Sequence, residues 1–366
     1  IWNVWGDIGN GLAFKSYYAY LGEGMHQLHV AGGNLSVTAD GYAMLSNVVV
    51  DAGNASLTAG AIYLVAASLP SSLDASGNVS LHTDMFAKWD GAAAPITAGG
   101  FIELAPRSAS HNVLLSSEVG FSNPTSYLYT DSYRPALVIH QDEWALLDAT
   151  TVKISAGTSG GSLKFVDGGT VTAPVGITRL ELAAPAGTIT QTANNPYTLA
   201  VDEMTAFNYS GDLVLAAGGA ITLDAANLIN GGTNGIAVTA TGGEFTLNTT
   251  GALKLGNIVA GSQYVTLGAG GAVTQFGGSA IATASLDVTS TGSITLTEAG
   301  NQIDAISAVT PGAFTFTNAG AILGAYQAAS ATLTSPSTIS IYQPGDFTLA
   351  AGHVFNAGSD ILIAAA

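Results

Sequence analysis

Side chains that could act in acid–base catalysis are concentrated in two short stretches of this 366-residue chain. Each stretch mixes acids, bases and cations: His82, Asp84, Lys88 and Asp90 in the first, and Arg134, His140, Gln141, Asp142, Glu143 and Asp148 in the second. Two neighbouring carboxyl groups can serve as general acid and general base in the cleavage of a polysaccharide. The second stretch is the better candidate, and a polysaccharide lyase or hydrolase is one hypothesis.

The balance of charge weakens that hypothesis. The chain has 25 acidic and 8 basic residues, which gives a net charge of −17. An enzyme that cleaves acidic polysaccharides needs a basic groove, and here the basic residues are spread over the whole length. Nucleic acids and anionic membrane surfaces also select for Lys and Arg. The composition therefore favours a protein that is not an enzyme, and it predicts no nucleic-acid partner.

Other motifs for catalysis or metal binding are missing from the sequence or stand in the wrong context. Gly157-Thr-Ser-Gly-Gly161 matches G-x-S-x-G, but that motif works on a strand-to-helix turn, and no helical pattern follows it. The six histidines lack the i, i+4 spacing of a helical zinc site, and there is no cysteine. We therefore expect no metal and no cofactor. Triplets of the form N-x-S/T, expected by chance in a chain rich in Ser and Thr, leave glycosylation open at Asn34, Asn54, Asn78, Asn208 and Asn248.

A short repeated phrase indicates the elements that must position these residues. From Gly211 to Leu323, a small turn residue is followed by apolar, polar and apolar residues, as in Gly219-Ala-Ile-Thr-Leu223. This two-residue period is typical of a strand with one buried face. Many of the phrases come in closely spaced pairs. From pair to pair the pattern steps from Phe245 to Val265, then to Leu286 and, over a longer interval, to Phe314.

A repeat of this length signals a solenoid. A unit of about 20 to 22 residues is too short for a βαβ crossover, which takes roughly 30 residues, but it suits one coil of a parallel β-helix. The step from Phe245 to Val265 recurs from Leu28 to Val48 and from Leu35 to Ala55. The sequence therefore predicts an all-β fold, a right-handed parallel β-helix of roughly 16 to 18 coils. Stacked coils bury a continuous core that no single coil could form.

The regularity of the phrase also predicts the domain organisation. Residues 28–366 form a single β-solenoid with an elaborated, loop-rich region at 84–150. Residues 1–27 are rich in aromatic side chains and form an N-terminal cap, an inter-subunit segment or a surface for stacking carbohydrate. The candidates for inter-subunit contact are the aromatic residues of this segment and two apolar residues near the other end: Trp2, Trp5, Phe14, Tyr17, Tyr18, Tyr20, Ile361 and Ile363.

Loops that extend from one face of a solenoid often form its binding face. Residues 84–150 hold many aromatic side chains and two of the three arginines of the chain. The ligand-binding candidates in this region are Trp89, Tyr127, Tyr129, Tyr133, Arg134 and Trp144. The alternative is that the loops merely tolerate insertions.

The repeated phrases are also similar to those of a known family. The segments 292–301, 303–307 and 314–320, which begin with Gly292-Ser-Ile-Thr-Leu296, resemble the repeats of large filamentous-haemagglutinin-type exoproteins. The likeness covers residues 150–366 and, more loosely, 28–82. It implies a secreted right-handed β-helix on a bacterial surface, which acts in adhesion or as a stalk. The amino-terminal secretion module of that family is not recognisable in residues 1–27, which leaves the export route open.

These observations favour a non-catalytic structural protein, the building block of an extracellular bacterial filament or of an adhesin stalk. The apolar run Ile361–Ala366 has no polar cap, which indicates that the chain continues or that copies stack end to end. We expect no membrane span, because no apolar run reaches the roughly 18 residues that a spanning helix needs. The start at Ile1 indicates a removed signal peptide or an excerpt of a longer protein. The alternatives are an adhesin that binds carbohydrate or a host surface through residues 84–150, and the enzyme.

Overall fold

In the residues described by the computed structural model, the protein is a parallel β-solenoid of about 13 turns with almost no helix, and the predicted fold class is confirmed. The structure describes residues 2–22, 26–65, 72–88, 94–118, 136–191, 205–327, 330–343 and 353–365. The chain folds as two compact units, residues 1–188 with 192–205 and residues 189–191 with 206–366. In the described residues, α1 (Gln141–Trp144) is the only α-helix, and none is long and apolar enough to span a membrane.

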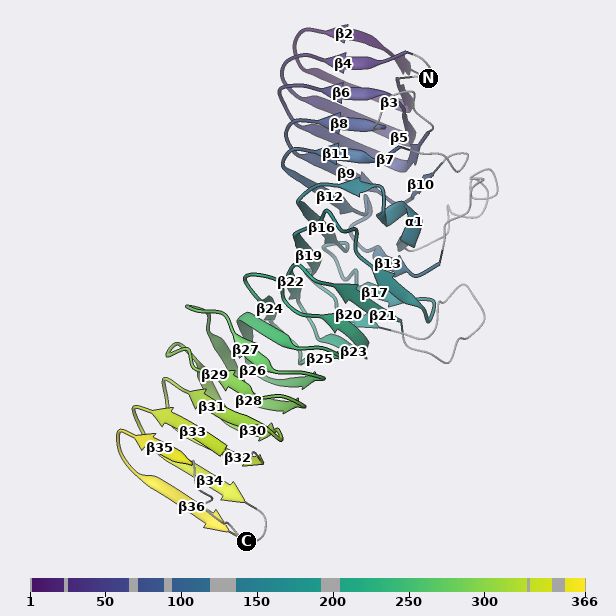
Figure 1. Ribbon diagram of the computed structural model, residues 1–366. Coiled ribbons are helices and arrows are strands. Elements are labelled where there is room, and N and C mark those ends of the chain that lie inside the picture. Colours follow the sequence, from purple (N-terminus) through teal and green to yellow (C-terminus); the bar gives the residue numbers. More distant parts are fainter. Residues whose placement is uncertain are drawn as a thin grey trace. The chain divides into compact units, whose positions relative to one another are not determined.

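In the first unit, successive coils place their strands over one another on three faces (Figure 1). One face is a six-stranded parallel sheet of β2 (Gly6–Ile8), β4 (Leu28–Val30), β6 (Val48–Val50), β8 (Leu73–Ala75), β11 (Ile96–Ala98) and β15 (Leu147–Asp148). The next face carries the early residues of three long strands, β3 (Leu12–Leu21), β5 (Leu35–Leu45) and β7 (Ala55–Leu64), followed by β9 (Val79–Thr83), β12 (Phe101–Ala105), β16 (Thr151–Ser155) and β19 (Arg179–Ala184). The third face carries β1 (Trp2–Val4), the late residues of the same three long strands, and β10 (Phe86–Lys88).

The region predicted to be loop-rich contains additional strands. β14 (Ala136–Ile139) pairs in parallel with β13 (Asn112–Ser116), which in turn pairs with β17 (Leu163–Val166). β14 also lies next to β10, so it adds a rung to the third face between β10 and β13. The short strand β18 (Thr170–Thr172) follows. Because of this insertion, the coil from Ile102 to its register partner Val152 is more than twice as long as the coil before it, from Val79 to Ile102.

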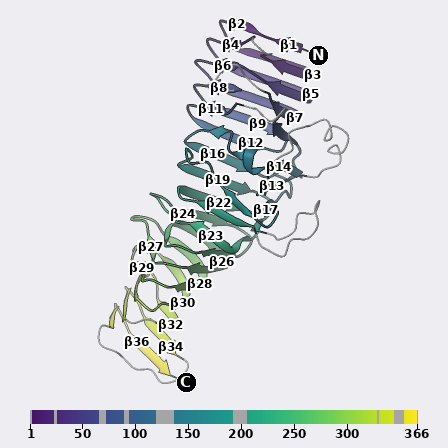
Figure 2. The same cartoon turned by 45° about the vertical axis from the view of Figure 1, so that its right-hand side comes forward.

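The second unit repeats three strand positions, and its stacked rungs are the green and yellow strands of Figures 1 and 2. One series is β20 (Ile189–Gln191), β23 (Ile221–Ile229), β25 (Phe245–Thr249), the late part of β26 (Leu253–Ala269), the late part of β28 (Ile281–Ser290), β30 (Gln302–Val309), β32 (Ile322–Gln327), β34 (Ile339–Gln343) and β36 (Ile361–Ala365). A second series is β22 (Asp212–Ala217), β24 (Ile236–Ala240), residues 258–259 of β26, residues 281–282 of β28 and the first residues of β30. The third is residues 253–255 of β26, β27 (Val273–Gln275), β29 (Ile294–Leu296), β31 (Ala313–Thr317), β33 (Ser330–Ser335) and β35 (Val354–Ala357). β21 (Ala206–Tyr209) pairs with the end of β23.

The alternating phrase explains why these strands stack. In β25, Phe245 and Leu247 are fully buried while Thr246 between them faces outward, and Val265 and Leu267 occupy the same positions one coil later. Side chains of like position therefore pack over one another, and each coil closes the core of the next. Burial of such aliphatic and phenyl groups contributes about 1.5–3 kcal/mol for each side chain, which makes the interior the main stabilising element.

Asparagine side chains link successive coils at one corner of the first unit. The Asn34 Oδ1 atom accepts a hydrogen bond of 2.9 Å from the backbone N–H of Asn54, and Asn54 accepts one of 2.8 Å from Asn78. Asn78 in turn accepts one of 3.0 Å from the backbone N–H of Phe101. Backbone groups that a turn would otherwise leave without a partner are thus satisfied by the coil before it.

Two sequence expectations about the coils were only partly correct. The predicted stacking of Leu28 on Val48, of Leu35 on Ala55 and of Phe245 on Val265 is confirmed. The prediction that Phe314 follows Leu286 in the repeat after a longer interval was wrong. Leu286 pairs with Ile306, and Phe314 pairs with Ile294, both at the ordinary interval of one coil. The prediction of roughly 16 to 18 coils was too high, because several coils of the first unit exceed the assumed length of about 20 to 22 residues.

Candidate functional site

The structure brings together residues from both polar stretches that the sequence singles out. Lys88 ends β10, and α1 packs against that strand. The Nζ atom of Lys88 forms an ion pair with the Oδ2 atom of Asp142 in α1, and these side chains are only 15% and 21% exposed. We call Lys88, Asp142 and Glu143 the Lys88 cluster. The lysine is far from the two acids in sequence, and they meet because the insertion returns the chain to the rung beside β10.

Glu143 is the buried acid of this cluster, with 2% of its surface exposed. Its Oε2 atom accepts a hydrogen bond of 3.0 Å from the backbone N–H of His140, which fixes the first turn of α1. Burial raises the pKa of the Glu143 carboxyl to about 8. The N–H groups of His140 and Lys88 and the Lys88 ammonium lower this pKa, and the Asp142 carboxylate raises it further. Glu143 therefore holds its proton at neutral pH, next to an ion pair.

The remaining polar candidates are dispersed. His82 is exposed on the outer face of β9, and Asp148 is exposed on β15. Asp84 accepts hydrogen bonds of 2.9 Å and 2.8 Å from the backbone N–H and the hydroxyl of Ser108, and it lies 3.1 Å from the Nδ1 atom of His111. These contacts anchor a turn. Asp90 and Arg134 lie outside the described residues. The sequence suggested Asp142 and Glu143 as two carboxyl groups that could act as acid and base. The arrangement differs from that expectation, because the Asp142 carboxylate forms an ion pair with Lys88.

The ligand-binding candidates of the loop-rich region are mostly outside the described residues: Trp89, Tyr127, Tyr129, Tyr133 and Arg134. Trp144, at the end of α1, is 1% exposed and packs into the protein. A ring in that position contributes to the core of the insertion and presents no face to a ligand.

The aromatic candidates near the start of the chain divide into two groups. Tyr18 and Tyr20 project from the outer face of β3, where they join Tyr42 of β5 and Tyr63 of β7, and we call these four residues the outer tyrosine cluster. The ring centroids of Tyr18 and Tyr42 are 4.4 Å apart, and the hydroxyls of Tyr20 and Tyr42 are 2.5 Å apart. Burial, with the hydrogen bond to Tyr20, raises the pKa of the Tyr42 hydroxyl above its ordinary value.

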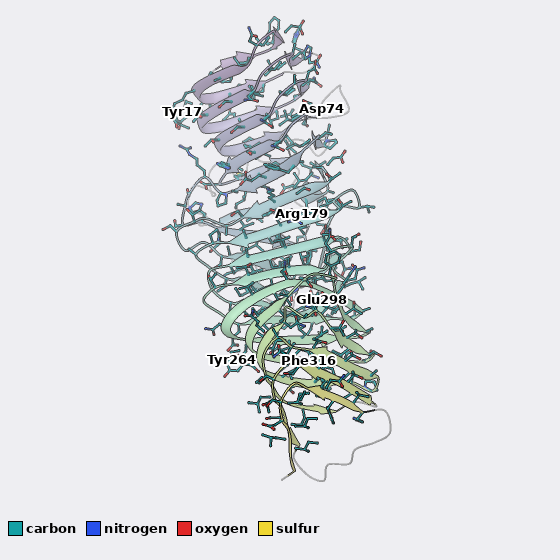
Figure 3. The ribbon with its side chains drawn as sticks, turned by 90° about the vertical axis from the view of Figure 1, so that its left-hand side faces the viewer. Tyr17, Asp74, Arg179, Tyr264, Glu298 and Phe316 are labelled. Carbon is teal, nitrogen blue, oxygen red and sulfur yellow. The ribbon has the colours of Figure 1, made fainter. Side chains whose placement is uncertain are left out.

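The other aromatic candidates take different positions. Tyr17 is 60% exposed and projects from the surface (Figure 3), and Trp5 is 58% exposed and stacks on His26 with ring centroids 5.0 Å apart. Phe14 is half-buried, in register with the core residue Val37. Trp2 lies in β1 and pairs with Ala19. The strands β1, β2 and β3 of residues 1–27 are thus the first rungs of the same faces that the later coils continue.

Sequence reasoning missed Tyr42 and Tyr63. Their signal was present in the spacing, because the steps from Tyr18 to Tyr42 and from Tyr42 to Tyr63 are each close to one coil. The apolar candidates Ile361 and Ile363 lie in β36 and are 46% and 41% exposed. They are in register with Ile339 and Ile341 of β34, which are buried.

Part of the chain is similar to a known family of repeats. Residues 242–310, which run from just before β25 through β30, match repeats of unknown function (DUF5649). No curated protein and no solved structure matches the chain. The match supports the description of this part of the chain as a repeat array, and the filamentous-haemagglutinin likeness stays a resemblance.

Proposed function

We propose that this protein is a non-catalytic structural component of a bacterial surface, secreted and assembled outside the cell as part of a filament or as the stalk of an adhesin. The observation that carries the proposal is the continuous stacking of coils in each unit, with parallel pairing on every face and an apolar interior. Such a fold gives stiffness and length from a small repeated unit, which are the properties a stalk requires.

The surface chemistry supports the same role. The chain carries a net charge of −17, and it is rich in Thr, Ser, Asn and Asp at the outward positions of its strands and turns. In the described residues, no group of three or more His, Asp or Glu side chains is arranged to hold a metal ion. A polar, acidic exterior keeps an extended protein soluble and prevents its sides from associating.

We include end-to-end association of copies in the proposal, with β36 as one contact. The exposed Ile361 and Ile363 continue the interior stack of Ile339 and Ile341. A further parallel strand paired with β36 would bury both side chains. The partner strand would come from another copy of this chain.

Negative-stain electron microscopy and sedimentation of the purified chain test this association. We expect filaments or end-to-end oligomers for the unaltered chain, and single particles for the double variant Ile361→Lys/Ile363→Lys. The matched control is Leu362→Lys, because Leu362 lies between the two residues, is 59% exposed and faces the other way. Single particles of the unaltered chain at all concentrations would refute the association. Equal effects of the control and the double variant would refute the role of β36.

Recognition of surface glycans or of a host surface is the second candidate function. The outer tyrosine cluster favours it, because the partly exposed rings of Tyr18, Tyr20 and Tyr42 can stack on the apolar faces of sugars. The loops of residues 84–150 remain the alternative location. A glycan array with Tyr18→Ala/Tyr20→Ala, and with Tyr264→Ala as the exposed control in the second unit, separates the two locations.

A further inference from the structure

The Lys88 cluster places an amine, a carboxylate and a second carboxyl together in a mostly buried location. Lys88 and Asp142 are in contact through Nζ and Oδ2. Glu143 is adjacent to Asp142 in α1, and its carboxyl group accepts hydrogen bonds from the backbone N–H of Lys88 as well as from that of His140. Glu143 is therefore held by backbone groups of both β10 and the turn before α1, next to the ion pair of Lys88 and Asp142.

Burial makes the ionic form of this pair costly. Removing an ammonium and a carboxylate from water costs several kcal/mol for each ion, and their mutual attraction often fails to offset that cost. An amide formed from the same two groups carries no charge and needs only ordinary hydrogen bonds. The environment thus disfavours the separated ions and favours their condensation product.

We propose that Lys88 and Asp142 join in an intramolecular amide bond between Nζ and Cγ, and that Glu143 is the acid that assists its formation. After a proton passes from Lys88 to Asp142, the lone pair of Nζ attacks Cγ of the neutral Asp142 carboxyl. The C–N bond forms, the bond from Cγ to one carboxyl oxygen breaks, and that oxygen leaves as water. The two hydrogens of the water balance one proton from the amine and one from the carboxyl.

Glu143 is suited to move these protons. Because its pKa is raised to about 8, its carboxyl is protonated at neutral pH and can donate a hydrogen to the departing oxygen. It then recovers a proton from the nitrogen, so it is unchanged at the end of the reaction. The contact between Nζ of Lys88 and the Asp142 carboxyl supplies the proximity that an intramolecular condensation requires.

Other lysine–carboxylate pairs of the described residues lack this combination. Lys153 and Glu181 are 3.7 Å apart with side chains 36% and 28% exposed, and Lys15 and Asp40 are 3.9 Å apart with side chains 71% and 44% exposed. Water solvates these ions, and a surface pair of this kind adds little to stability. The contrast makes Lys153 a matched control for Lys88.

The bond would fasten the insertion to the solenoid. It would join β10 to α1 and close the chain between residues 88 and 142 into a covalent loop. A cross-link of this size restricts the unfolded chain and resists pulling along the backbone. Such a restraint suits an extracellular protein that has no cysteine for disulfide bonds.

The test is the intact mass of the full chain, purified and measured under denaturing conditions that break ion pairs. We expect the unaltered chain to be lighter than its sequence mass by one water, and proteolysis to release a peptide with Lys88 joined to a peptide with Asp142. Lys88→Arg keeps the ion pair but offers no amine, so it should have its full mass. Glu143→Gln should also have its full mass or form the bond far more slowly, while Lys153→Arg should still lose one water.

A full sequence mass for the unaltered chain, together with separate peptides after proteolysis, would overturn the proposal. A bond that forms as fast in Glu143→Gln as in the unaltered chain would overturn the role of Glu143. Circular dichroism of each variant shows whether it has folded, so that the loss of the bond is not mistaken for the loss of structure. None of these outcomes depends on filament formation, and the inference stands or falls separately from the proposed function.

Discussion

The second unit and the insertion of the first unit both bury polar side chains, but they use different groups. In the second unit, the amides of Gln191 and Asn227 are buried and bonded to each other, at 2.5 Å from Nε2 to Oδ1. In the insertion, the acid Glu143 is buried next to the charged pair of Asp142 and Lys88 of β10, whose side chains are mostly buried. Amides do not titrate in the ordinary pH range, whereas carboxyl and amine groups do. The buried pair of the second unit is therefore neutral at any ordinary pH, whereas the insertion buries an acid that titrates.

The amide pair is also repeated. Further along the second unit, the side-chain amides of Gln275 and Asn301 bond to each other, at 2.7 Å from Nε2 of Gln275 to Oδ1 of Asn301 and at 3.0 Å from Nδ2 of Asn301 to Oε1 of Gln275. The Oδ1 atom of Asn301 also accepts a hydrogen bond from the backbone N–H of Ile281. Each amide fills a corner where the chain turns between faces and where backbone groups would have no strand partner. Neutral hydrogen-bonding groups fulfil this role at a lower desolvation cost than ions.

Removal of the Asn227 side chain is expected to lower the free energy of unfolding more than any other change considered below. Its Oδ1 accepts hydrogen bonds from Gln191 and from the backbone N–H of Phe207, and the two N–H groups of Nδ2 are shared among three carbonyl oxygens. Asn227→Ala leaves these buried groups without partners and should lower the free energy of unfolding by about 3–5 kcal/mol at any pH. Urea unfolding followed by circular dichroism measures the change.

The control for this variant is Asn257→Ala. Asn257 is exposed and accepts one hydrogen bond, of 2.9 Å, from the backbone N–H of Ala280. Its loss should cost about 1 kcal/mol or less. Similar losses in the two variants would mean that the buried amides are no more important than exposed ones, and the comparison drawn above would fail.

The ionisation of Glu143 is expected to change the stability of the insertion by a smaller amount, which depends on pH. Its pKa is raised from 4.5 to about 8 in the folded chain, so unfolding releases a proton between these values. The stability of the insertion is therefore highest below about pH 4.5 and falls as the pH rises towards 8. The change is roughly 2–4 kcal/mol for a buried acid of this kind. Hydrogen exchange of the α1 backbone amides at pH 5.5 and pH 9 measures it, after correction for the intrinsic rate.

Lys88→Arg is the background in which to measure this dependence, because it keeps the charge and excludes an amide bond. In that background Glu143→Gln, which carries a neutral group of the same shape, should abolish the pH dependence of the α1 amides. A pH dependence that persists in the double variant would assign it to another group and remove Glu143 from the argument.

Most of the fold could be predicted from the sequence, because the coil is a local pattern. Phrases such as those at Phe245 and Val265 alternate strictly, and their spacing equals one coil, so periodicity alone gives the strand, its buried face and its partner. The error at Leu286 and Phe314 has a physical origin. Each coil has more than one strand position, and a phrase from one face was compared with a phrase from another.

The candidate site could be predicted only in part. The sequence identified Lys88, Asp142 and Glu143 as chemically capable, but it placed the lysine in a different group from the acids. Their contact depends on β14 taking the rung next to β10, against the order of the chain, and no periodic signal encodes that step. The pKa of Glu143 follows from burial, which the sequence of a short polar segment does not reveal.

Three of the N-x-S triplets, which were expected to occur by chance, have a structural explanation. Asn34, Asn54 and Asn78 form the hydrogen-bonded corner described above, and the serine two residues after each lies on the outer face of the next strand. The spacing of Asn and Ser is thus set by the geometry of the coil: a corner residue, an inward residue and an outward residue. Their amide oxygens already bond to neighbouring coils, which favours a structural role for these asparagines.

The smallest change in stability with pH is expected from His29, a half-buried residue of the six-stranded sheet that pairs with two exposed carboxylates. Its Nε2 lies 2.6 Å from Asp51 and its Nδ1 lies 2.9 Å from Asp7, and these hydrogen bonds, that of Asp51 first, raise its pKa above 6.5. The contribution to stability is present below pH 6.5 and is lost as the pH rises through the raised value, the same direction as for Glu143. Solvent screening keeps this contribution to stability small.

NMR titration of His29 measures the effect of each carboxylate. Asp51→Asn should lower the pKa of His29 more than Asp7→Asn does. The control is Asp74→Asn, which changes an exposed residue of β8 in register with Val49 and should leave the pKa of His29 unchanged. An unshifted pKa in the unaltered chain would show that exposed charges on this sheet do not interact, and pH sensitivity would then belong to the buried insertion alone.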